Sequence, residues 1–394
     1  MNAIGSVPRA LEHAGPARPG RISFLLPGLR AGGSEHVVTF TANRLIERGH
    51  AVEIISFESG SAAPYYTPDP RIALHYLALP VAQRAKLAAL GEIAQRTGRL
   101  RKHLKNSRPD LLISFLTRTN VQAILASRGL DIPVIVSERN NPVQQDPGAA
   151  WRWLRARLYP KAFGLITMTH GAMACFPPQM RRRSWVIPNM SEFGENRAIC
   201  HDGDIRHLVA VGRLTHQKGF DLLLESFAAI APHHPNWRLT IWGDGPDRTK
   251  LETLRNQLGL ADRVLMPGVT NKPGGWITNA DAFVLSSRFE GWGLVLGEAM
   301  AAGLPSVSFA CDFGPAEMIR NEEDGLLVRA GDVPALAAAL DRLMGDAALR
   351  KRLGARAQET SRQFRPDRIG QLWIDLVENV LAEIAPTDGL IGTS

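Results

Sequence analysis

Short apolar runs bounded by glycine and proline recur along the first half of the chain, and their lengths are typical of buried strands. The first run, residues 21–27, is followed by a glycine-rich turn at 28–34, a helical pattern over 35–48 and a second apolar run at 52–57. This order of strand, glycine turn, helix and strand is the βαβ unit of a parallel sheet. Further apolar runs continue the alternation at 111–116, 134–136, 164–167 and 185–187.

A polar stretch containing glycines interrupts this pattern, and beyond it the alternation of apolar runs and helical segments starts again. The later strands are predicted at 208–211, 239–242, 264–266, 282–285 and 305–309, and two of the helices at 219–230 and 248–258. We therefore predict an α/β fold of two Rossmann-like, doubly wound parallel-sheet domains, with ligands bound beyond the strand carboxyl ends in a cleft between the domains. The predicted parts are a loose leader at 1–20, a first domain at 21–190, a linker at 191–206, a second domain at 207–365, and a C-terminal helix and tail at 366–394.

Composition narrows the class of protein. The 394 residues are 45% hydrophobic, which suits a globular chain of two domains better than a disordered one. Because Cys175, Cys200 and Cys311 are scattered, neither a disulfide framework nor a cysteine zinc site is expected, and a cytoplasmic location fits best. No apolar run approaches the ~20 residues that cross a bilayer, and the leader lacks the apolar segment of a signal peptide.

The charge is distributed unevenly along the chain. Residues 1–200 carry 26 Lys and Arg against 13 Asp and Glu, a net charge of +13, whereas the remaining residues have a net charge of −5. A basic half of this kind is expected to meet an anionic partner. Nucleic acid, a phosphorylated substrate and an anionic lipid surface all fit, and a solvated basic surface is the alternative.

Several candidate ligand-binding residues follow predicted strands of the second half. Arg213 and Lys218 lie five positions apart in the loop before a predicted helix, where two fixed cations and free helix amides favour a diphosphate. Solvated loop charges are the alternative for this pair taken alone. Gly243, in a Gly-Asp-Gly turn, and Gly268 follow the next two strands, and both allow the backbone to approach a ligand, although such turns are also common at strand ends.

The strongest motif spans residues 286–305. Glu290 begins a glycine loop, and Glu298 lies eight positions later inside the predicted helix. The first carboxylate can accept hydrogen bonds from sugar hydroxyls and the second from a ribose, and the helix start between them forms an anion cradle. The block therefore predicts a site for a nucleotide-diphosphate sugar. The candidate binding residues between the two glutamates are Gly291, Trp292, Gly293, Leu294 and Val295.

Together these motifs resemble the retaining glycosyltransferases of family 4, which have the GT-B architecture. The resemblance covers about residues 20–385 and is most specific in the second half. The similar segments are Val211-Gly-Arg-Leu, Lys218-Gly, Gly243-Asp-Gly-Pro, Ser287-Arg-Phe-Glu-Gly-Trp-Gly and Glu298-Ala-Met-Ala-Ala-Gly-Leu-Pro, with Gly32-Gly-Ser-Glu and Ile187-Pro-Asn in the first half.

The resemblance implies a role for each matching residue of the second half. Arg213 and Lys218 would neutralise the donor diphosphate, and these two cations with Glu290 are the candidate catalytic residues. Glu290 would contact the transferred sugar, and Glu298 would bind the ribose of the nucleotide. Fixed donors and cations can stabilise the departing diphosphate without a metal, so neither a metal nor a cofactor is expected.

In the first half, the resemblance implies that Gly32 and Gly33 bring backbone close to the reacting phosphate, and that the helix at 366–384 crosses back onto the first domain. One departure is notable. Many family members have a histidine after the fourth strand, where this chain has Val136-Ser-Glu-Arg-Asn-Asn. No catalytic histidine is therefore assigned, and Arg139 becomes a candidate for contacting sugar or phosphate.

Two other features each allow two interpretations. Asp202 and Asp204 form a carboxylate pair of the metal-binding type, but their place in the linker favours a solvated turn. The basic segment 151–161 has Trp151, Leu154 and Leu158 on one helical face, which fits either a helix lying on an anionic membrane or one packed on the sheet, and packing is favoured.

These observations predict a retaining, metal-independent hexosyltransferase that uses a UDP- or GDP-linked sugar and a saccharide acceptor carried on a polyprenyl diphosphate, in surface polysaccharide or glycan assembly. Its expected location is the cytoplasm, peripheral to the inner face of the cytoplasmic membrane. A storage-glycan or sucrose-type synthase of the same fold is one alternative. A nucleic-acid-binding protein is another, but no nucleic-acid fold signature is present. An oxidoreductase is disfavoured because the first strand lacks the Gly-x-Gly-x-x-Gly turn.

Overall fold

The computed structural model describes residues 18–30, 32–60, 63–78, 86–145, 147–191, 205–270 and 274–385, which form two compact units. The N-terminal unit contains the described residues up to Met168, residues Ala172–Ile187 and the chain from Asp367. The C-terminal unit contains Thr169–Gly171 and the described part of Pro188–Pro366. Most of the predicted leader and linker, including Cys200, Asp202 and Asp204, lies outside the described residues.

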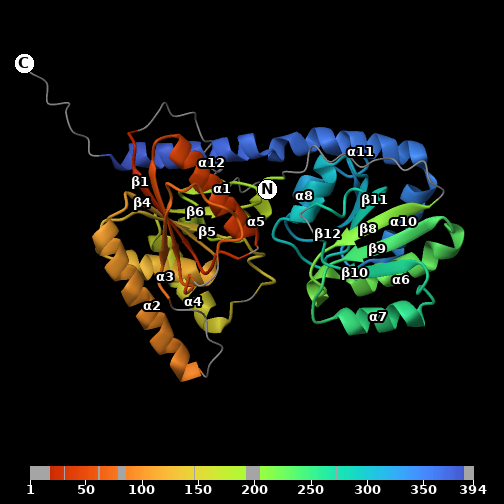
Figure 1. The fold of residues 1–394 in the computed structure, drawn as a ribbon, viewed down its shortest axis with the longest axis horizontal. Helices are drawn as coiled ribbons and strands as arrows, with labels where there is room; N and C mark the ends of the chain where they lie inside the picture. The colour runs from red at the N-terminus through yellow and green to blue at the C-terminus, as the bar shows by residue number, and fades with distance from the viewer. Residues whose placement is uncertain are drawn as a thin grey trace, which may run out of the picture. The chain divides into compact units, whose positions relative to one another are not determined.

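A seven-stranded sheet forms the centre of the N-terminal unit, in the order β3-β2-β1-β4-β5-β6-β7 (Figure 1). All neighbouring strands are parallel. Because helices cover both faces, every residue of β4 is buried, which is why the strands of this sheet read as continuous apolar runs. The strands are β1 (Arg21–Leu26), β2 (Ala51–Ser56), β3 (Ala73–Tyr76), β4 (Leu111–Phe115), β5 (Val134–Ser137), β6 (Gly164–Thr167) and β7 (Ser184–Val186).

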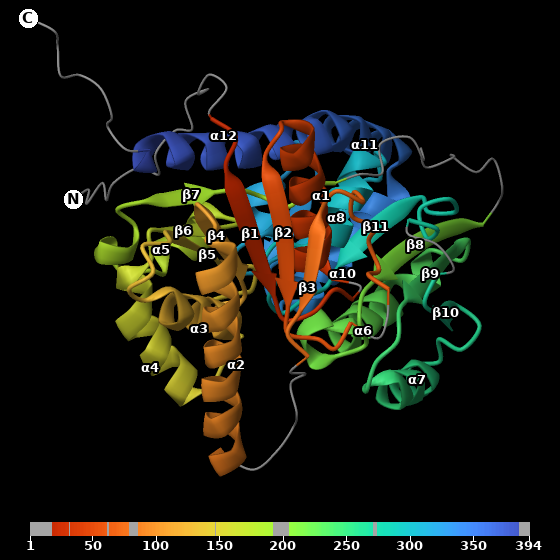
Figure 2. The same cartoon turned by 60° about the vertical axis from the view of Figure 1, so that its left-hand side comes forward.

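The helices of this unit cover its sheet from two sides (Figure 2). They are α1 (Gly33–Glu47), α2 (Lys86–Ser107), α3 (Thr117–Ser127), α4 (Ala149–Leu158), α5 (His170–Ala174), which spans the division between the units, and α12 (Pro366–Ile384). On one face, Leu100 of α2 and Val121 of α3 pack in a core with Leu112 of β4. On the other, the ring of Phe115 stacks on Trp373 of α12, with 6.0 Å between centroids.

A six-stranded parallel sheet forms the centre of the C-terminal unit, in the order β10-β9-β8-β11-β12-β13. The strands are β8 (Arg206–Val211), β9 (Trp237–Trp242), β10 (Val264–Gly268), β11 (Ala282–Leu285), β12 (Ser306–Ala310) and β13 (Leu326–Arg329). Successive strands add outward from β8 on one side and from β11 on the other. The winding therefore reverses between β8 and β11, and ligands of such sheets bind at this switch point.

The helices of the C-terminal unit are α6 (Phe220–Ile230), α7 (Arg248–Gln257), α8 (Leu294–Ala301), α9 (Pro315–Met318), α10 (Val333–Gly345) and α11 (Ala347–Ser361). Leu223 of α6 and Leu340 of α10 are fully buried in one core with Ile241 of β9. The side chain of Asp332 accepts a hydrogen bond from the amide of Ala335 and so caps the start of α10. Short 3₁₀ turns occur at 159–161, 178–180, 216–218, 231–233 and 362–364.

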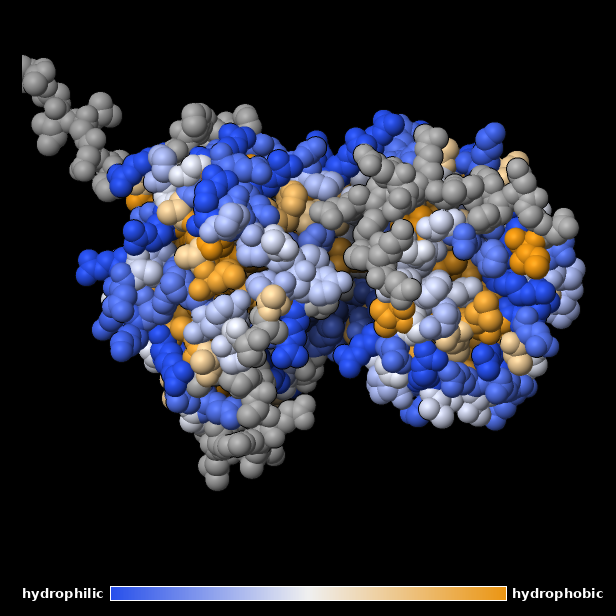
Figure 3. Space-filling model, viewed as in Figure 1, coloured by the Kyte–Doolittle hydropathy of each residue, from blue (hydrophilic) through white to orange (hydrophobic). Residues whose placement is uncertain are grey.

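The predicted α/β fold with two doubly wound parallel sheets is confirmed. No local pattern predicts β3, because this edge strand is half-exposed and lacks the apolar run of a central strand. No described helix is long and apolar enough to cross a membrane. Hydrophilic residues predominate on the surface in Figure 3, with small apolar patches between them.

Candidate functional site

Two loops of the C-terminal unit meet at the switch point of its sheet. One loop follows β8 and the other follows β11, the adjacent strand. The hydroxyl of Ser286 donates to the carbonyl of Lys218 at 2.9 Å, and the amide of Arg288 donates to the carbonyl of Gln217 at 2.8 Å. The side-chain amide of Gln217 in turn donates to the carbonyl of Phe289 at 3.1 Å. The two loops are therefore held as one rigid platform.

Lys218 and Glu290 form an ion pair on this platform, with 2.5 Å between Nζ and Oε1. Their side chains are 18% and 7% exposed, so water screens the pair weakly. The hydroxyl of Ser287 donates to the same Glu290 oxygen at 2.7 Å. A Cβ atom at Gly212 would lie 3.0 Å from Cε of Lys218, so the absence of a side chain there gives the lysine stem its place. The structure thus brings together two of the three predicted catalytic residues.

Arg213, the third predicted catalytic residue, lies in the loop after β8 and is exposed. Within the part of the chain that the structure describes, its guanidinium forms no ion pair. The nearby Arg288 differs, because it is paired with Asp221 at the start of α6, with contacts of 2.6 and 2.8 Å. Unlike Arg288, Arg213 can therefore turn toward an anionic ligand without breaking an ion pair.

Gly243 joins the loop after β9 to this platform. Its φ is +135°, and a Cβ atom there would lie 1.9 Å from the carbonyl oxygen of Gly212. Its amide donates to the carbonyl of Gly268 at 2.7 Å. Close approach of three loop backbones accounts for a glycine at 243 independently of a ligand, and the predicted binding roles of Gly243 and Gly268 remain predictions.

The predicted glycine cradle lies at the start of α8. Gly293 caps the helix in the left-handed conformation, with φ +91°. Leu294, Val295 and Glu298 are half-buried, and the glutamate lies one turn into the helix as expected. Trp292 differs from the other residues of this segment, since it is 4% exposed and its ring packs edge-on against Phe364 at 5.0 Å. The ring of Trp292 therefore has a packing role, and the predicted contact of this residue with a ligand stays a prediction.

The remaining predicted residues belong to the N-terminal unit. Gly32 and Gly33 follow β1 and lead into α1, next to the point where the order of that sheet reverses between β1 and β4. A Cβ atom at Gly32 would lie 2.3 Å from Oε2 of Glu35, so a glycine at this position leaves room for the Glu35 carboxylate. Burial raises the pKa of Glu35, and this effect exceeds that of its backbone hydrogen bond.

Arg139 lies inside the N-terminal unit, where 7% of its surface is exposed. Its guanidinium carbon is 5.6 Å from the ring centroid of Phe115 and 5.2 Å from that of Trp373. Nε donates to the hydroxyl of Ser137 and Nη1 to the carbonyl of Ile187, each at 3.0 Å. Burial lowers the pKa of Arg139 to about 9, so the group is charged at neutral pH. This packing accounts for the buried guanidinium without a ligand, and the predicted contact of Arg139 with sugar or phosphate stays a prediction.

The motifs of the sequence do not single out Cys311, whose thiol lies within electrostatic range of the ion pair. Cys311 directly follows β12 and is 1% exposed. Burial, with the negative charge of Glu290 as the second cause, raises the pKa of its thiol to about 12. The Cys311 thiol is therefore neutral at physiological pH. The signal that was available is the position of Cys311 after a strand of the same sheet edge.

The same edge gathers no group of three metal-ligating side chains among the residues that the structure describes. Positive charge on the described residues of this site is carried by Lys218 and Arg213, beside the helix start of α8. Such an arrangement can bind a diphosphate and stabilise negative charge that develops on it as a leaving group.

Two family models together match most of the chain. The model described as "Glycosyl transferase 4-like domain" matches residues 32–189, and the model described as "Glycosyl transferases group 1" matches residues 196–360. The first match falls mainly in the N-terminal unit and the second in the C-terminal unit.

Curated relatives agree with these matches. LpsD, a lipopolysaccharide core biosynthesis glycosyltransferase of Rhizobium meliloti, is 31% identical over 69% of this chain and 82% of its own length. A Campylobacter jejuni α-1,4-N-acetyl-D-galactosaminyltransferase, named for a PP-undecaprenol-linked acceptor, is 29% identical over 91% of this chain and 99% of its own. An exopolysaccharide phosphotransferase of Streptomyces coelicolor is 31% identical over 92% of this chain, and the chain spans 41% of that protein.

Solved structures share the fold. Sucrose-phosphate synthase from Thermosynechococcus elongatus matches with a TM-score of 0.80 and 19% identity, over 92% of this chain and all of the other. Anabaena HepE, solved in complex with UDP, matches with a TM-score of 0.76 and 18% identity, over 91% of this chain and all of the other.

Proposed function

Because this chain belongs to the family 4 glycosyltransferases, which have the GT-B fold, we propose that it transfers a hexose from a nucleotide-diphosphate sugar to a saccharide acceptor with retention of configuration. The observation that carries this proposal is the buried Lys218–Glu290 pair on two hydrogen-bonded loops at the switch point, beside the exposed Arg213. A cation held in place before the ligand arrives stabilises developing charge without reorganisation during the reaction.

In the proposed reaction, the bond between C1 of the hexose and the diphosphate breaks, and C1 bonds to a hydroxyl oxygen of the acceptor. The acceptor proton passes to an oxygen of the departing diphosphate, which leaves as a nucleoside diphosphate. Lys218 and Arg213 hold that diphosphate, while Glu290 accepts hydrogen bonds from the sugar hydroxyls. Because these cations and the α8 amides supply the positive charge, the chemical step requires no metal.

We propose a UDP- or GDP-linked donor. Glu298, half-buried one turn into α8, would bind the ribose hydroxyls common to both nucleotides. The UDP complex of HepE, a protein of the same fold, supports a uridine nucleotide as the first donor to test. The base would be recognised through backbone groups near Gly268, which do not by themselves select uracil or guanine.

We propose a saccharide acceptor carried on a polyprenyl diphosphate, in the assembly of surface polysaccharide or glycan. The PP-undecaprenol-linked acceptor in the name of the Campylobacter jejuni relative, and the lipopolysaccharide core role in that of LpsD, support this choice. The similarity to sucrose-phosphate synthase, at 19% identity, is one of fold and does not favour a sucrose-type synthase. We propose no nucleic-acid partner, because the two matched family models are both of glycosyltransferases and the basic half is assigned to an anionic lipid surface.

We propose that the enzyme acts in the cytoplasm and touches the inner membrane surface through α4. The predicted interfacial face of this helix, with Trp151 and Leu154, packs against the core of the N-terminal unit, so it does not face lipid. The opposite face carries Trp153, which is 59% exposed, together with the exposed Arg152 and Arg157. An exposed tryptophan among arginines suits an anionic lipid surface.

Thermal unfolding with a panel of nucleotide-sugars tests the donor. A true donor is expected to raise the midpoint in proportion to the logarithm of its concentration, because it binds only the folded state. Turnover of that donor is then measured with and without EDTA, and we expect no difference once each sample is corrected for its folded fraction. A panel in which no UDP-, GDP- or ADP-sugar shifts the midpoint would contradict the proposed function, and a strict requirement for Mg²⁺ or Mn²⁺ would contradict the mechanism.

A further inference from the structure

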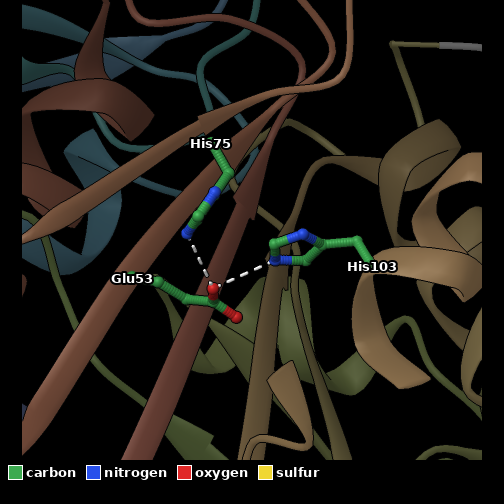
Figure 4. Close-up of side chains that lie close together, drawn as sticks. All are labelled: Glu53, His75 and His103. Atoms are coloured by element: carbon green, nitrogen blue, oxygen red, sulfur yellow. Dashed lines mark hydrogen bonds and ion pairs between the residues drawn. The ribbon is translucent and has the colours of Figure 1, made fainter. Parts of the chain in front are cut away.

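A cluster of one carboxylate and two imidazoles lies in the N-terminal unit, outside the candidate donor site. Glu53 of β2, His75 of β3 and His103 of α2 point toward one another (Figure 4). Oε2 of Glu53 is 3.0 Å from Nε2 of His103 and 3.3 Å from Nε2 of His75. We propose that these three side chains form a Zn²⁺ site that ties together β2, β3 and α2.

The spacing of the ligand atoms fits such an ion. Two atoms bound at about 2.0–2.1 Å to a tetrahedral Zn²⁺ lie about 3.3 Å apart. The two distances from the Glu53 oxygen already have this size, and the three ligand atoms all lie within 4.8 Å of one another. A small rotation of the imidazoles, whose centroids are 4.5 Å apart, would complete the three-ligand arrangement. Imidazole nitrogen and carboxylate oxygen are both common ligands of Zn²⁺.

Strand register explains why the ligands share one face. Glu53 lies opposite Ala73 on β3, and His75 is two residues further along, so both side chains project from the same side of the sheet. His103 reaches the same point from α2, which covers that side. Because the three residues come from separate elements, they meet only in the folded unit.

Burial and a hydrogen bond from Ser23 hold the Glu53 carboxylate in an orientation suited to binding a metal ion. The Glu53 side chain is 8% exposed, and the hydroxyl of Ser23 on β1, its partner in the strand register, donates to the other oxygen, Oε1. This contact fixes the carboxylate orientation and leaves Oε2 for the metal, as supporting residues of metal sites do. His75 is 43% exposed, which gives an ion access and leaves a position for water as the fourth ligand.

Hydrogen bonding alone is the competing explanation, with each imidazole donating Nε2–H to the carboxylate. It requires a proton on both facing nitrogens, 3.0 and 3.3 Å from one acceptor oxygen. A Zn²⁺ ion would take the place of the two Nε2 protons, and each neutral imidazole would then carry its proton on Nδ1. The two explanations therefore differ in metal stoichiometry and in the stabilisation that metal provides.

The test is a titration of the full chain, without a histidine tag and stripped with chelator, with Zn²⁺ alone. We expect one high-affinity Zn²⁺ per chain by calorimetry and elemental analysis, a higher midpoint of thermal unfolding with Zn²⁺, and no such change with Mg²⁺. Replacement by Co²⁺ is expected to give the visible absorption of a four-coordinate ion.

Variants assign the site. H75Q, at the most exposed ligand, and H103Q are each expected to weaken Zn²⁺ binding at least about 10-fold and to abolish the Zn²⁺-dependent rise in midpoint. The positioning variant S23A should weaken binding by about 10-fold while keeping the three ligands. The matched control is H233Q, because His233 forms an exposed His–carboxylate pair with Asp341 in the C-terminal unit. The H233Q variant should bind Zn²⁺ with the affinity of the wild type.

Three outcomes would overturn the proposal. They are absence of Zn²⁺ binding by the wild type, wild-type binding retained in both H75Q and H103Q, and a rise in midpoint that persists in these variants. Because H75Q changes a half-exposed side chain, a correctly folded variant is expected even where E53Q, at the buried carboxylate, fails to fold.

Discussion

At the scale of single residues, Lys218 and Glu290 show how one contact can serve both stability and chemistry. Each side chain satisfies the charge of the other inside a weakly screened environment, while Ser287 fixes the carboxylate. A bound diphosphate would share the lysine cation with Glu290. The pair therefore keeps the cation in position before the donor arrives, and the same contact stabilises the loop platform.

Replacing Lys218 by alanine is expected to cost about 2–4 kcal/mol of transition-state stabilisation in kcat/KM. It should also lower the free energy of unfolding by about 3 kcal/mol, because the buried Glu290 carboxylate is left without a cation. The double variant K218A/E290Q removes that unpaired charge, so it should recover much of the stability and none of the activity. Steady-state kinetics and urea denaturation measure the two effects separately.

The matched control for this lysine is K250A. The Lys250 side chain is 84% exposed, and its replacement removes one ion pair, with Asp247 at 3.7 Å. It should behave as the wild type in both measurements. Full turnover by K218A would refute the assignment of Lys218 to the diphosphate.

Arg139 illustrates a charge used for packing. Its guanidinium lies between Phe115 and Trp373 rather than at the unit surface. We expect R139M to keep kcat/KM within about threefold of the wild type, because a flexible apolar side chain can fill the space between the rings. R139A should instead lower the free energy of unfolding by about 3 kcal/mol through the cavity it leaves.

Kinetics and denaturation on both Arg139 variants decide its role. If R139M and R139A lose activity equally and severely while R139M stays stable, Arg139 contacts the substrate. Retained activity in R139M would assign it to the core.

At the scale of elements, the site is built where loops follow neighbouring strands of one parallel sheet. The loops after β8 and β9 approach so closely that Gly243 has no room for a side chain beside Gly212. The loop after β11 is tied to the same platform by side-chain and backbone hydrogen bonds. The precision of the site thus depends on contacts among loops as much as on the helices they lead into.

Gly243→Ala is expected to destabilise the C-terminal unit by more than about 3 kcal/mol, because its Cβ would lie 1.9 Å from the carbonyl oxygen of Gly212 and its φ is +135°. The matched control is Gly259→Ala, at φ +69° with nothing within 4 Å of the added Cβ. The control should cost about 1–2 kcal/mol, the backbone strain alone. Guanidinium denaturation measures the free energy of unfolding of both variants. Equal losses of stability would show that the close approach to Gly212 does not contribute to the effect.

At the scale of the whole molecule, charge divides the chain. Residues 1–200 carry a net charge of +13 and the rest a net charge of −5. An anionic surface is therefore attracted mainly to the first half, and the attraction should weaken as salt screens it. The outer face of α4, with Trp153, adds an apolar contact to this electrostatic one.

Co-sedimentation with vesicles tests this contact. We expect binding to phosphatidylglycerol-containing vesicles, little binding to neutral ones, and a decrease with added salt. W153A should weaken binding, and R157A should weaken it about fivefold, corresponding to about 1 kcal/mol for a basic residue near the surface. The control is L265A, another exposed apolar side chain, in the C-terminal unit. Equal binding to anionic and neutral vesicles would contradict a membrane role for the basic half.

The two sheets and the loops at their switch points could be predicted because their signals are local. Apolar runs marked the central strands, and the Gly-Arg, Gly-Asp-Gly and Glu-Gly-Trp-Gly segments marked the strand ends. The edge strand β3 and the Glu53 cluster could not be predicted in this way. A single glutamate in the apolar run at 52–57 was a sign that a polar contact lay inside the unit, but nothing local indicated that His75 and His103 would meet it.

Local patterns along the chain suffice for the α/β class, the central strands, and the candidate cations and carboxylates of the donor site, because periodicity and turn chemistry act over a few neighbouring residues. Which of those side chains touch depends instead on the packing of the folded units. The fold also positions residues that the patterns did not connect. It paired Lys218 with Glu290, placed Arg139 and Trp292 among aromatic rings, and brought Glu53, His75 and His103 together. Burial and long-range contact depend on how helices and strands distant in the chain pack, and no local pattern carries that information.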